Sequence, residues 1–196
     1  MIDDQSVFLN VPFDKGYERL FVALVATLIS IGRTPRCVLE IPEMGQGRLN
    51  RIQGLIEECR VSIHDLSRVG TPVRFNMPFE LGIACILARL RKNHDFIILE
   101  KKRYRLDITL SDMKGRDPLI HEGSPRTIVS CIIDALGSPS GDPQLSQVYR
   151  TSSTLWRVAK ELKKRANRST IFARSLFHQI AEAAVELSIE QGLLKS

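Results

Sequence analysis

The chain has 196 residues, of which 43% are hydrophobic and 26% charged, and this composition is typical of a globular protein with one full hydrophobic core. No apolar run approaches the roughly 18 residues that a membrane span needs, and the acidic start "MIDDQ" is unlike a signal peptide. We therefore expect a cytoplasmic protein without a membrane partner. The four cysteines and four histidines show no metal-ligand spacing, which predicts no metal site.

The first 100 residues alternate between short apolar runs and longer stripes of helical period. This pattern predicts strands over residues 6–11, 36–41, 61–66 and 95–100, and helices over 17–31, 48–60 and 77–90. Gly32 and Pro35 end the first helix. Strands separated by helices at this spacing indicate an α/β fold, in which a parallel sheet has helices on both faces. We expect the flavodoxin-like strand order 2-1-3-4.

The pattern weakens after residue 100. Residues 106–110, "LDITL", are a candidate fifth strand, and residues 125–136 predict a helix with Pro125 in its first turn and Gly137 after its end. "GSPSGDP", residues 137–143, is typical of a linker. Two amphipathic helices follow, with Ser169 or Thr170 as the cap of the second. We expect an α/β domain over 1–137 and a basic helical hairpin over 143–196.

Residues 143–196 hold nine Lys or Arg and four Glu, so this tail carries five of the six net positive charges. A solvated basic surface on a hairpin is the favoured interpretation, and binding of nucleic acid is the alternative. The second tail helix has apolar residues outside its main stripe, which predicts a homodimer or higher homo-oligomer. These residues are Phe172, Leu176, Ile189 and Leu193.

A binding site is expected outside the carboxyl ends of the strands, between the first and third strands. The loops over 10–16 and 64–77 meet there, and Glu80 follows in the first helical turn, so Asp65 and Glu80 are predicted at one site. Arg48 begins the second helix on the same edge, where a solvated helix start is the favoured interpretation and contact with a phosphate or pyrophosphate is the alternative. The other candidate lining residues are Asn10, Pro12, Phe13, Asp14, Ser67, Asn76 and Met77.

Structural roles for these residues stay open. If Pro78 is the first helical residue, Glu80 is the third and can bond back to the cap amide. Asp65 can cap its own loop, and Asn10, Pro12 and Asp14 can shape a turn.

The segments "VFLNVPFD", "DLSR" and "NMPFELGIA" resemble the nucleoside 2-deoxyribosyltransferase and TIR-like superfamily. The resemblance implies a flavodoxin-like fold in which a carboxylate at the helix entrance attacks or stabilises the anomeric carbon of a nucleoside or of NAD. That position is Glu80. Asp65 is the second catalytic candidate, because a second carboxylate can hold ribose hydroxyls or handle a proton. The resemblance also implies that Asp65 lies near the ribose or the base and that the "NVPFD" loop forms part of the pocket wall.

The resemblance thus implies an N-glycosidase or ribosyltransferase acting on NAD, a nucleoside or a nucleotide. This reaction needs no further cofactor, since NAD or the nucleotide is the substrate. A carboxylate suits this reaction because cleavage passes through an oxocarbenium-like state. The alternative is a non-catalytic nucleotide-sensing or signalling module that uses the same crevice or the basic tail. "RFNMPF" favours this alternative, because the transferases carry an acid and a Gly-Thr run there.

Overall fold

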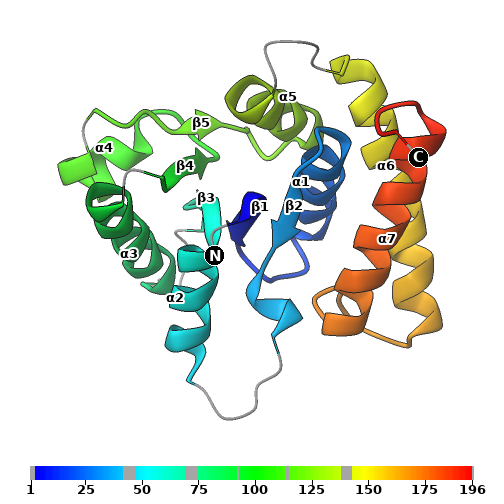
Figure 1. The fold of residues 1–196 in the computed structure, drawn as a ribbon, viewed down its shortest axis with the longest axis horizontal. Helices are drawn as coiled ribbons and strands as arrows, with labels where there is room; N and C mark the ends of the chain where they lie inside the picture. Colours follow the sequence, from blue (N-terminus) through cyan, green and yellow to red (C-terminus); the bar gives the residue numbers. More distant parts are fainter. Residues whose placement is uncertain are drawn as a thin grey trace. The chain divides into compact units, whose positions relative to one another are not determined.

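The computed structural model describes residues 3–41, 47–68, 75–91, 93–113, 115–137 and 143–195. It contains a five-stranded parallel sheet of order β2-β1-β3-β4-β5 (Figure 1). The strands are β1 (Asp3–Asn10), β2 (Thr34–Arg36), β3 (Cys59–Asp65), β4 (Asp95–Glu100) and β5 (Leu119–Ile120). The predicted α/β class, the order 2-1-3-4, the presence of a fifth strand and the C-terminal pair of helices are confirmed.

The described helices are α1 (Glu18–Ser30), α2 (Arg48–Glu58), α3 (Asn76–Leu90), α4 (Arg105–Thr109), α5 (Pro125–Leu136), α6 (Leu145–Arg165) and α7 (Arg174–Glu190), with short 3-10 turns at Val38–Glu40 and Ser111–Met113. The chain divides into two compact units. The first unit comprises Met1–Pro12, Arg36–Val38 and Glu43–Glu122, and the second comprises Phe13–Pro35, Leu39–Pro42 and Gly123–Ser196.

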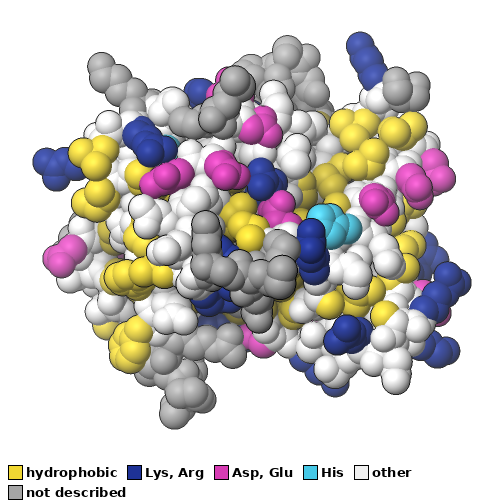
Figure 2. Space-filling model, turned by 60° about the horizontal axis from the view of Figure 1, so that its bottom comes forward, with side chains coloured by type: hydrophobic (Ala, Val, Ile, Leu, Met, Phe, Trp, Pro, Cys, Tyr) yellow, Lys and Arg dark blue, Asp and Glu magenta, His cyan; other side chains and the backbone are white. Residues whose placement is uncertain are grey.

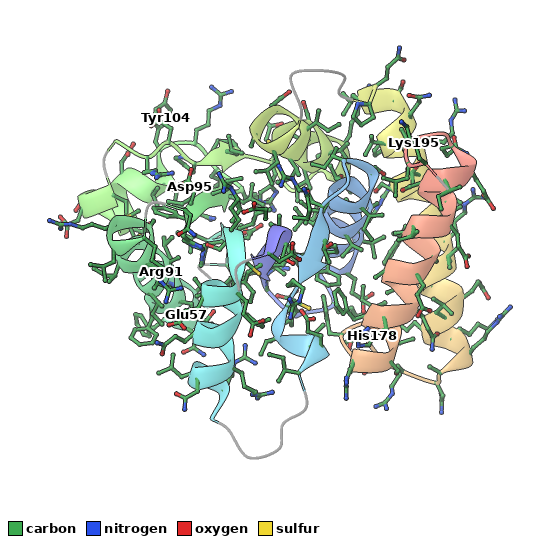
Figure 3. All side chains as sticks on the ribbon, viewed as in Figure 1. Glu57, Arg91, Asp95, Tyr104, His178 and Lys195 are labelled. Atoms are coloured by element: carbon green, nitrogen blue, oxygen red, sulfur yellow. The ribbon has the colours of Figure 1, made fainter. Side chains whose placement is uncertain are left out.

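In the first unit, β3 lies between β1 and β4. Asn10 of β1 is the register partner of His64, and His64 is in turn the partner of Ile98. α2 packs on β1 and β3, while α3 packs on β3 and β4. Glu57 of α2 and Arg91 after α3 lie close together (Figure 3), with an ion pair of 3.9 Å and a hydrogen bond from Arg91 to the Glu57 carbonyl.

In the second unit, α1 packs against α5, α6 and α7. α1 is buried around almost its whole circumference, which explains why its sequence is nearly continuously apolar. Gly32 ends the helix with a φ of 74°, a left-handed conformation that glycine adopts without steric cost. The rings of Phe13 and Phe21 pack on the ring of Phe172, with centroids 5.2 and 5.3 Å apart.

Two strand predictions are wrong. The strand predicted over 36–41 does not form. The shorter β2 ends at Arg36 and a 3-10 turn follows, so that Cys37 and Val38 are buried without an extended backbone. "LDITL" forms α4, and the fifth strand is β5. A strand there would have placed Leu106 and Ile108 on one face, but Leu106 is buried and Ile108 is 84% exposed.

The helix predictions are confirmed in type, with corrections of detail. Ser124 caps α5 by accepting a hydrogen bond from the Thr127 amide, and Pro125 begins the helix as expected. The predicted Ser169 or Thr170 cap of α7 is wrong, because the helix begins after Ala173 without a side-chain cap. Residues 42–46, 69–74 and 138–142, which hold most of the expected Gly-rich turn, the loop before α3 and the linker, lie outside the described residues.

The surface of α3 is unusually apolar. Four large side chains at helical spacing are exposed there: Phe75, Phe79, Ile86 and Leu90. Figure 2 shows hydrophobic side chains at the surface on one face of the molecule. None of the helices in the described part of the chain is both long and apolar enough to cross a bilayer.

Candidate functional site

Glu80 does not cap its helix. α3 begins at Asn76 with Phe75 as the cap residue, no side chain caps it, and the amide of Phe79 bonds to the carbonyl of Phe75. Pro78 is therefore the third helical residue and Glu80 the fifth, so the capping interpretation is wrong. Proline is tolerated there because the first four amides of a helix have no partner within the helix.

Glu80 is a buried carboxylate, only 4% exposed, near the start of α3. Its burial raises the pKa of the carboxyl group, whereas the charge of Arg48 and a hydrogen bond from the Asn10 side chain both lower it. Arg48 is exposed in the first turn of α2, and Asn10 is the last residue of β1. Three separate elements thus bring a carboxylate, a cation and an amide to one place in the first unit.

Asn10 is itself held by a histidine. Its Nδ2 lies 2.9 Å from Nδ1 of His64, its register partner on β3. His64 is wholly buried, and burial, followed by the nearby His94, lowers its pKa to about 3. The ring is therefore neutral at physiological pH, and it takes part in hydrogen bonds with Asn10 and Ser62.

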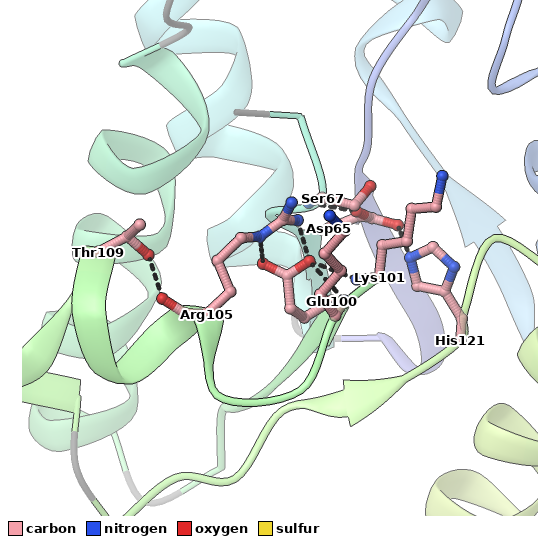
Figure 4. A network of polar contacts seen from close by, with 8 residues as sticks. Asp65, Ser67, Glu100, Lys101, Arg105, Thr109 and His121 are labelled. Carbon is pink, nitrogen blue, oxygen red and sulfur yellow. Dashed lines mark hydrogen bonds and ion pairs between the residues drawn. The ribbon is translucent and has the colours of Figure 1, made fainter. Parts of the chain in front are cut away.

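Asp65 is buried and already occupied (Figure 4). Its Oδ1 accepts a hydrogen bond of 2.8 Å from the Ser67 amide, and its Oδ2 lies 3.2 Å from Nε2 of His121, which is also wholly buried. Because side chains alternate along a strand, Asp65 projects to the face of β3 opposite to His64. The structure thus associates Glu80 with Asn10 and Arg48, and Asp65 with His121 and its own loop.

Another buried carboxylate, Glu100, lies near Asp65 and His121 (Figure 4). Glu100 ends β4, is 1% exposed and forms an ion pair with Arg105, whose Nε donates over 2.8 Å (Figure 4). It also accepts hydrogen bonds from the amides of Lys101 and Lys102. These contacts fix the turn between β4 and α4, so Glu100 has a structural role.

The other predicted site residues differ in accessibility and in unit. Pro12 is buried, Ser67 and Met77 are half-buried, and Asn76 is exposed at the start of α3. Phe13 and Asp14 belong to the second unit. There Phe13 packs on Phe172, and Oδ1 of Asp14 accepts from the Gly16 amide over 3.0 Å, so the turn-shaping role applies to Asp14.

Sequence reasoning missed the buried polar residues Ser62, His64, His94 and His121. A signal existed, because "VSIHDL" places two polar side chains on one face of an otherwise apolar strand, and a buried parallel strand rarely contains such residues without partners. Among the described residues, no three His, Cys, Asp or Glu side chains are arranged to hold a metal ion.

The fold and the cluster of Glu80, Asn10 and Arg48 define a class, namely a flavodoxin-like α/β protein with a buried glutamate beyond the carboxyl end of β3. Comparisons with protein-family models, curated proteins and solved structures find no match for the chain.

Proposed function

We propose that the protein cleaves or transfers the N-glycosidic bond of NAD, a nucleoside or a nucleotide, with Glu80 as the carboxylate at the anomeric carbon. Glu80 itself is the observation that supports the proposal most. Burying a carboxylate costs free energy, and this one is buried without the helix-capping role that would explain it structurally. It also lies at the edge of the sheet where ligands of this fold bind.

The reaction balances with the groups at hand. When the bond between C1′ and the base nitrogen breaks, both electrons leave with the base, and positive charge develops at C1′ and the ring oxygen. An ionised Glu80 stabilises this cation or bonds to C1′ as an ester. Water or a second base then bonds to C1′ and gives up a proton to the solvent. Nicotinamide leaves NAD as a neutral molecule, whereas a nucleoside base takes up one proton.

The neighbours of Glu80 suit these tasks. Burial makes its carboxylate more basic and strengthens its attraction to a developing cation. The Arg48 guanidinium is exposed and is our proposed contact for a phosphate or pyrophosphate of the substrate. Asn76 and Met77, on the first turn of α3, are proposed contacts of the sugar or the base. NAD and nucleotides are abundant in the cytoplasm, which stays our expected location.

One observation favours the alternative of a non-catalytic nucleotide-sensing or signalling module. Both oxygens of Asp65 contact groups of the chain itself, the Ser67 amide and His121. The second carboxylate that the resemblance places near the ribose is therefore committed to fixing its own loop. In our proposal Asp65 is a positioning residue, and Glu80 is the single catalytic carboxylate.

The test is product analysis with a charge-neutral variant. Purified protein is incubated separately with NAD, ribonucleosides and deoxynucleosides, and released nicotinamide or free base is quantified by chromatography. Glu80→Gln keeps the size of the side chain and should lower the rate by about three orders of magnitude or more. Glu57→Gln, which changes a half-exposed carboxylate of α2 paired with Arg91, is the matched control and should keep full activity.

Equal turnover by the wild type and a folded Glu80→Gln would remove Glu80 from the mechanism. If the wild type turns over none of these substrates but binds one of them in calorimetry, the nucleotide-sensing module replaces the enzyme.

A further inference from the structure

A chain of hydrogen bonds crosses the sheet of the first unit inside its core. It runs from Asn10 to His64 over 2.9 Å, from His64 to Ser62 over 2.9 Å, and from Ser62 to His94 over 3.2 Å. It ends where Nδ1 of His94 meets the carbonyl oxygen of Cys59 at 3.0 Å. The four side chains are at most 7% exposed. Five residues of β3, about 16 Å, separate its two ends along the strand.

The carbonyl of Cys59 fixes the direction of the bonds on the His94 side. A carbonyl oxygen only accepts, so Nδ1 of His94 must carry the proton. Burial lowers the pKa of His94, and the neutral ring therefore has an acceptor at Nε2. The Ser62 hydroxyl donates to that nitrogen, which leaves the Ser62 oxygen to accept from the next group along.

The same logic continues to Asn10. Nε2 of His64 donates to the Ser62 oxygen, and because His64 is neutral, its Nδ1 can only accept. The group of Asn10 that faces this nitrogen must then be the amide NH2 and not the carbonyl oxygen. This NH2 has a second hydrogen, which it can donate to Glu80, and a donated hydrogen bond lowers the pKa of a carboxyl group.

We propose that His94, Ser62 and His64 are positioning residues, which hold the amide nitrogen of Asn10 toward Glu80 and so keep the buried carboxylate ionised. If the bonds ran in the opposite direction, the Asn10 amide would be flipped and its carbonyl oxygen would face Glu80. Two acceptors would then oppose each other, and Glu80 would take up a proton. The proposal deepens the proposed function, on which it rests for its catalytic meaning, but the bond order is measurable without any substrate.

Charged groups around the two ends enter the same balance. The charge of Arg48 stabilises the ionised form of Glu80. Asp95 and Arg91 lie near His94, where the aspartate favours and the arginine disfavours the protonated ring. The chain therefore joins Glu80 to a histidine at the amino end of β4, on the opposite edge of the sheet.

Nitrogen-15 NMR of the histidine rings tests the bond order in the wild-type protein. We expect His64 to carry its proton on Nε2 and His94 on Nδ1, both neutral at pH 7. A proton on Nδ1 of His64 would overturn the proposal, and this measurement needs no variant that has to fold.

Titration of the Glu80 carboxyl carbon tests the consequence. Ser62→Ala breaks the chain in the middle, and Asn10→Leu removes the donor, so both should shift the Glu80 titration to higher pH. Ser6→Ala is the matched control, because Ser6 is also a buried serine of the sheet but bonds to Asp3 outside the chain. An unchanged Glu80 titration in a folded Ser62→Ala would refute the positioning role.

The two proposals fail separately. If the protein shows the expected tautomers and titrations but cleaves no substrate, the proposed enzymatic function is contradicted and the positioning role of the hydrogen bonds is supported. If the protein is an enzyme, Ser62→Ala should lower kcat with little change in KM and move the acid limb of the kcat pH profile in the same direction as the Glu80 titration. If turnover is lost in Glu80→Gln but is unchanged at every pH in Ser62→Ala, only the positioning role of the hydrogen-bond chain is contradicted.

Discussion

Asn10 and His64 face each other across β1 and β3 as register partners, and the 2.9 Å contact between Asn10 Nδ2 and His64 Nδ1 ties the last residue of one strand to the core of the next. Asn10 also bonds to Glu80. A single amide thus connects the buried polar interior of the sheet to the one carboxylate for which we propose catalysis. The ionisation of Glu80 and that of His64 both have measurable consequences for the free energy of unfolding.

Glu80→Gln should stabilise the protein at neutral pH. The pKa of Glu80 is raised above its ordinary value of 4.5, chiefly by burial, so the unfolded chain ionises more readily than the folded one as pH rises. The contribution of the Glu80 carboxyl group to the free energy of unfolding is therefore largest below pH 4.5 and is lost as pH rises through the folded pKa. The loss is about 1.4 kcal/mol for each pH unit between the unfolded and the folded pKa. Urea unfolding at pH 4 and pH 7 measures it: the variant should gain on the wild type only at pH 7.

His64 should make the protein sensitive to acid. Its pKa falls from 6.5 to about 3 on folding, mainly by burial, so its contribution is full above pH 6.5 and is lost as pH falls toward 3. The expected loss between pH 7 and pH 4 is about 3 kcal/mol. His64→Gln should flatten this part of the stability profile, whereas His178→Gln, which changes an exposed histidine, should leave it as it is. A parallel profile for the two variants would contradict the assignment.

Reversal of the tail charges should separate one structural lysine from its neighbours. Lys163 donates over 2.8 Å to Glu18, a buried carboxylate that also accepts from the Ile171 amide. Lys163→Glu should therefore cost about 3 kcal/mol of unfolding free energy, because it faces one carboxylate with another. Lys164→Glu, next to it and exposed, should cost almost nothing.

The ion pair with Glu18 sets Lys163 apart from the solvated basic surface that we expected on the hairpin. Binding to RNA and DNA is best tested with Lys160, Lys164 and Arg165 reversed together, since all three are exposed. Weak binding by the wild type that does not change with salt or with this variant would exclude the nucleic-acid alternative for the tail.

A homo-oligomer stays a prediction, and we now expect its surface on α3, although Ile189 of α7, one of the residues that suggested the tail, is also 38% exposed. In α7 and before it, Leu176 is buried and Phe172 packs on Phe21 within the same unit. The exposed row of α3 is symmetric about Gly82 and Ile83: in an antiparallel pair, Phe79 would oppose Ile86 of a second copy, and Phe75 would oppose Leu90. Gly82 has open space beside it, where two helices can approach closely.

Light scattering at micromolar concentration tests this arrangement. A double change of Ile86 and Leu90 to Glu should give the mass of a monomer. Matched changes of the exposed Val185 and Ile189 of α7 to Glu should keep the oligomer. A monomeric wild type would end the prediction, and loss of the oligomer only in the α7 variant would return the interface to the tail.

The strength of periodic signals explains which elements the sequence predicted. α1, α3 and α5 and the strands β1, β3 and β4 have long apolar patterns of one period, and they form near their predicted places. The short segments failed. "LDITL" alternates like a strand, but Arg105 at its start is bound to Glu100, and the chain turns into α4. A contact between residues five positions apart at a turn leaves no periodic trace in the sequence.

The sequence by itself determined the parallel sheet and the place of Glu80 in the helix after the third strand, because these follow from periodicity and from the alternation of strands and helices. Periodicity allows more than one strand order, and the flavodoxin-like order that we expected is the one that the structure has. Only the tertiary structure decided that Glu80 is buried, that it is the fifth residue of its helix, and that Asp65 is turned to His121 on the opposite face. It also decided the partners of Asn10, His64, Ser62 and His94. The reason is physical: desolvation and hydrogen-bond direction depend on groups that lie far apart in the sequence, and no local pattern records which of them will meet.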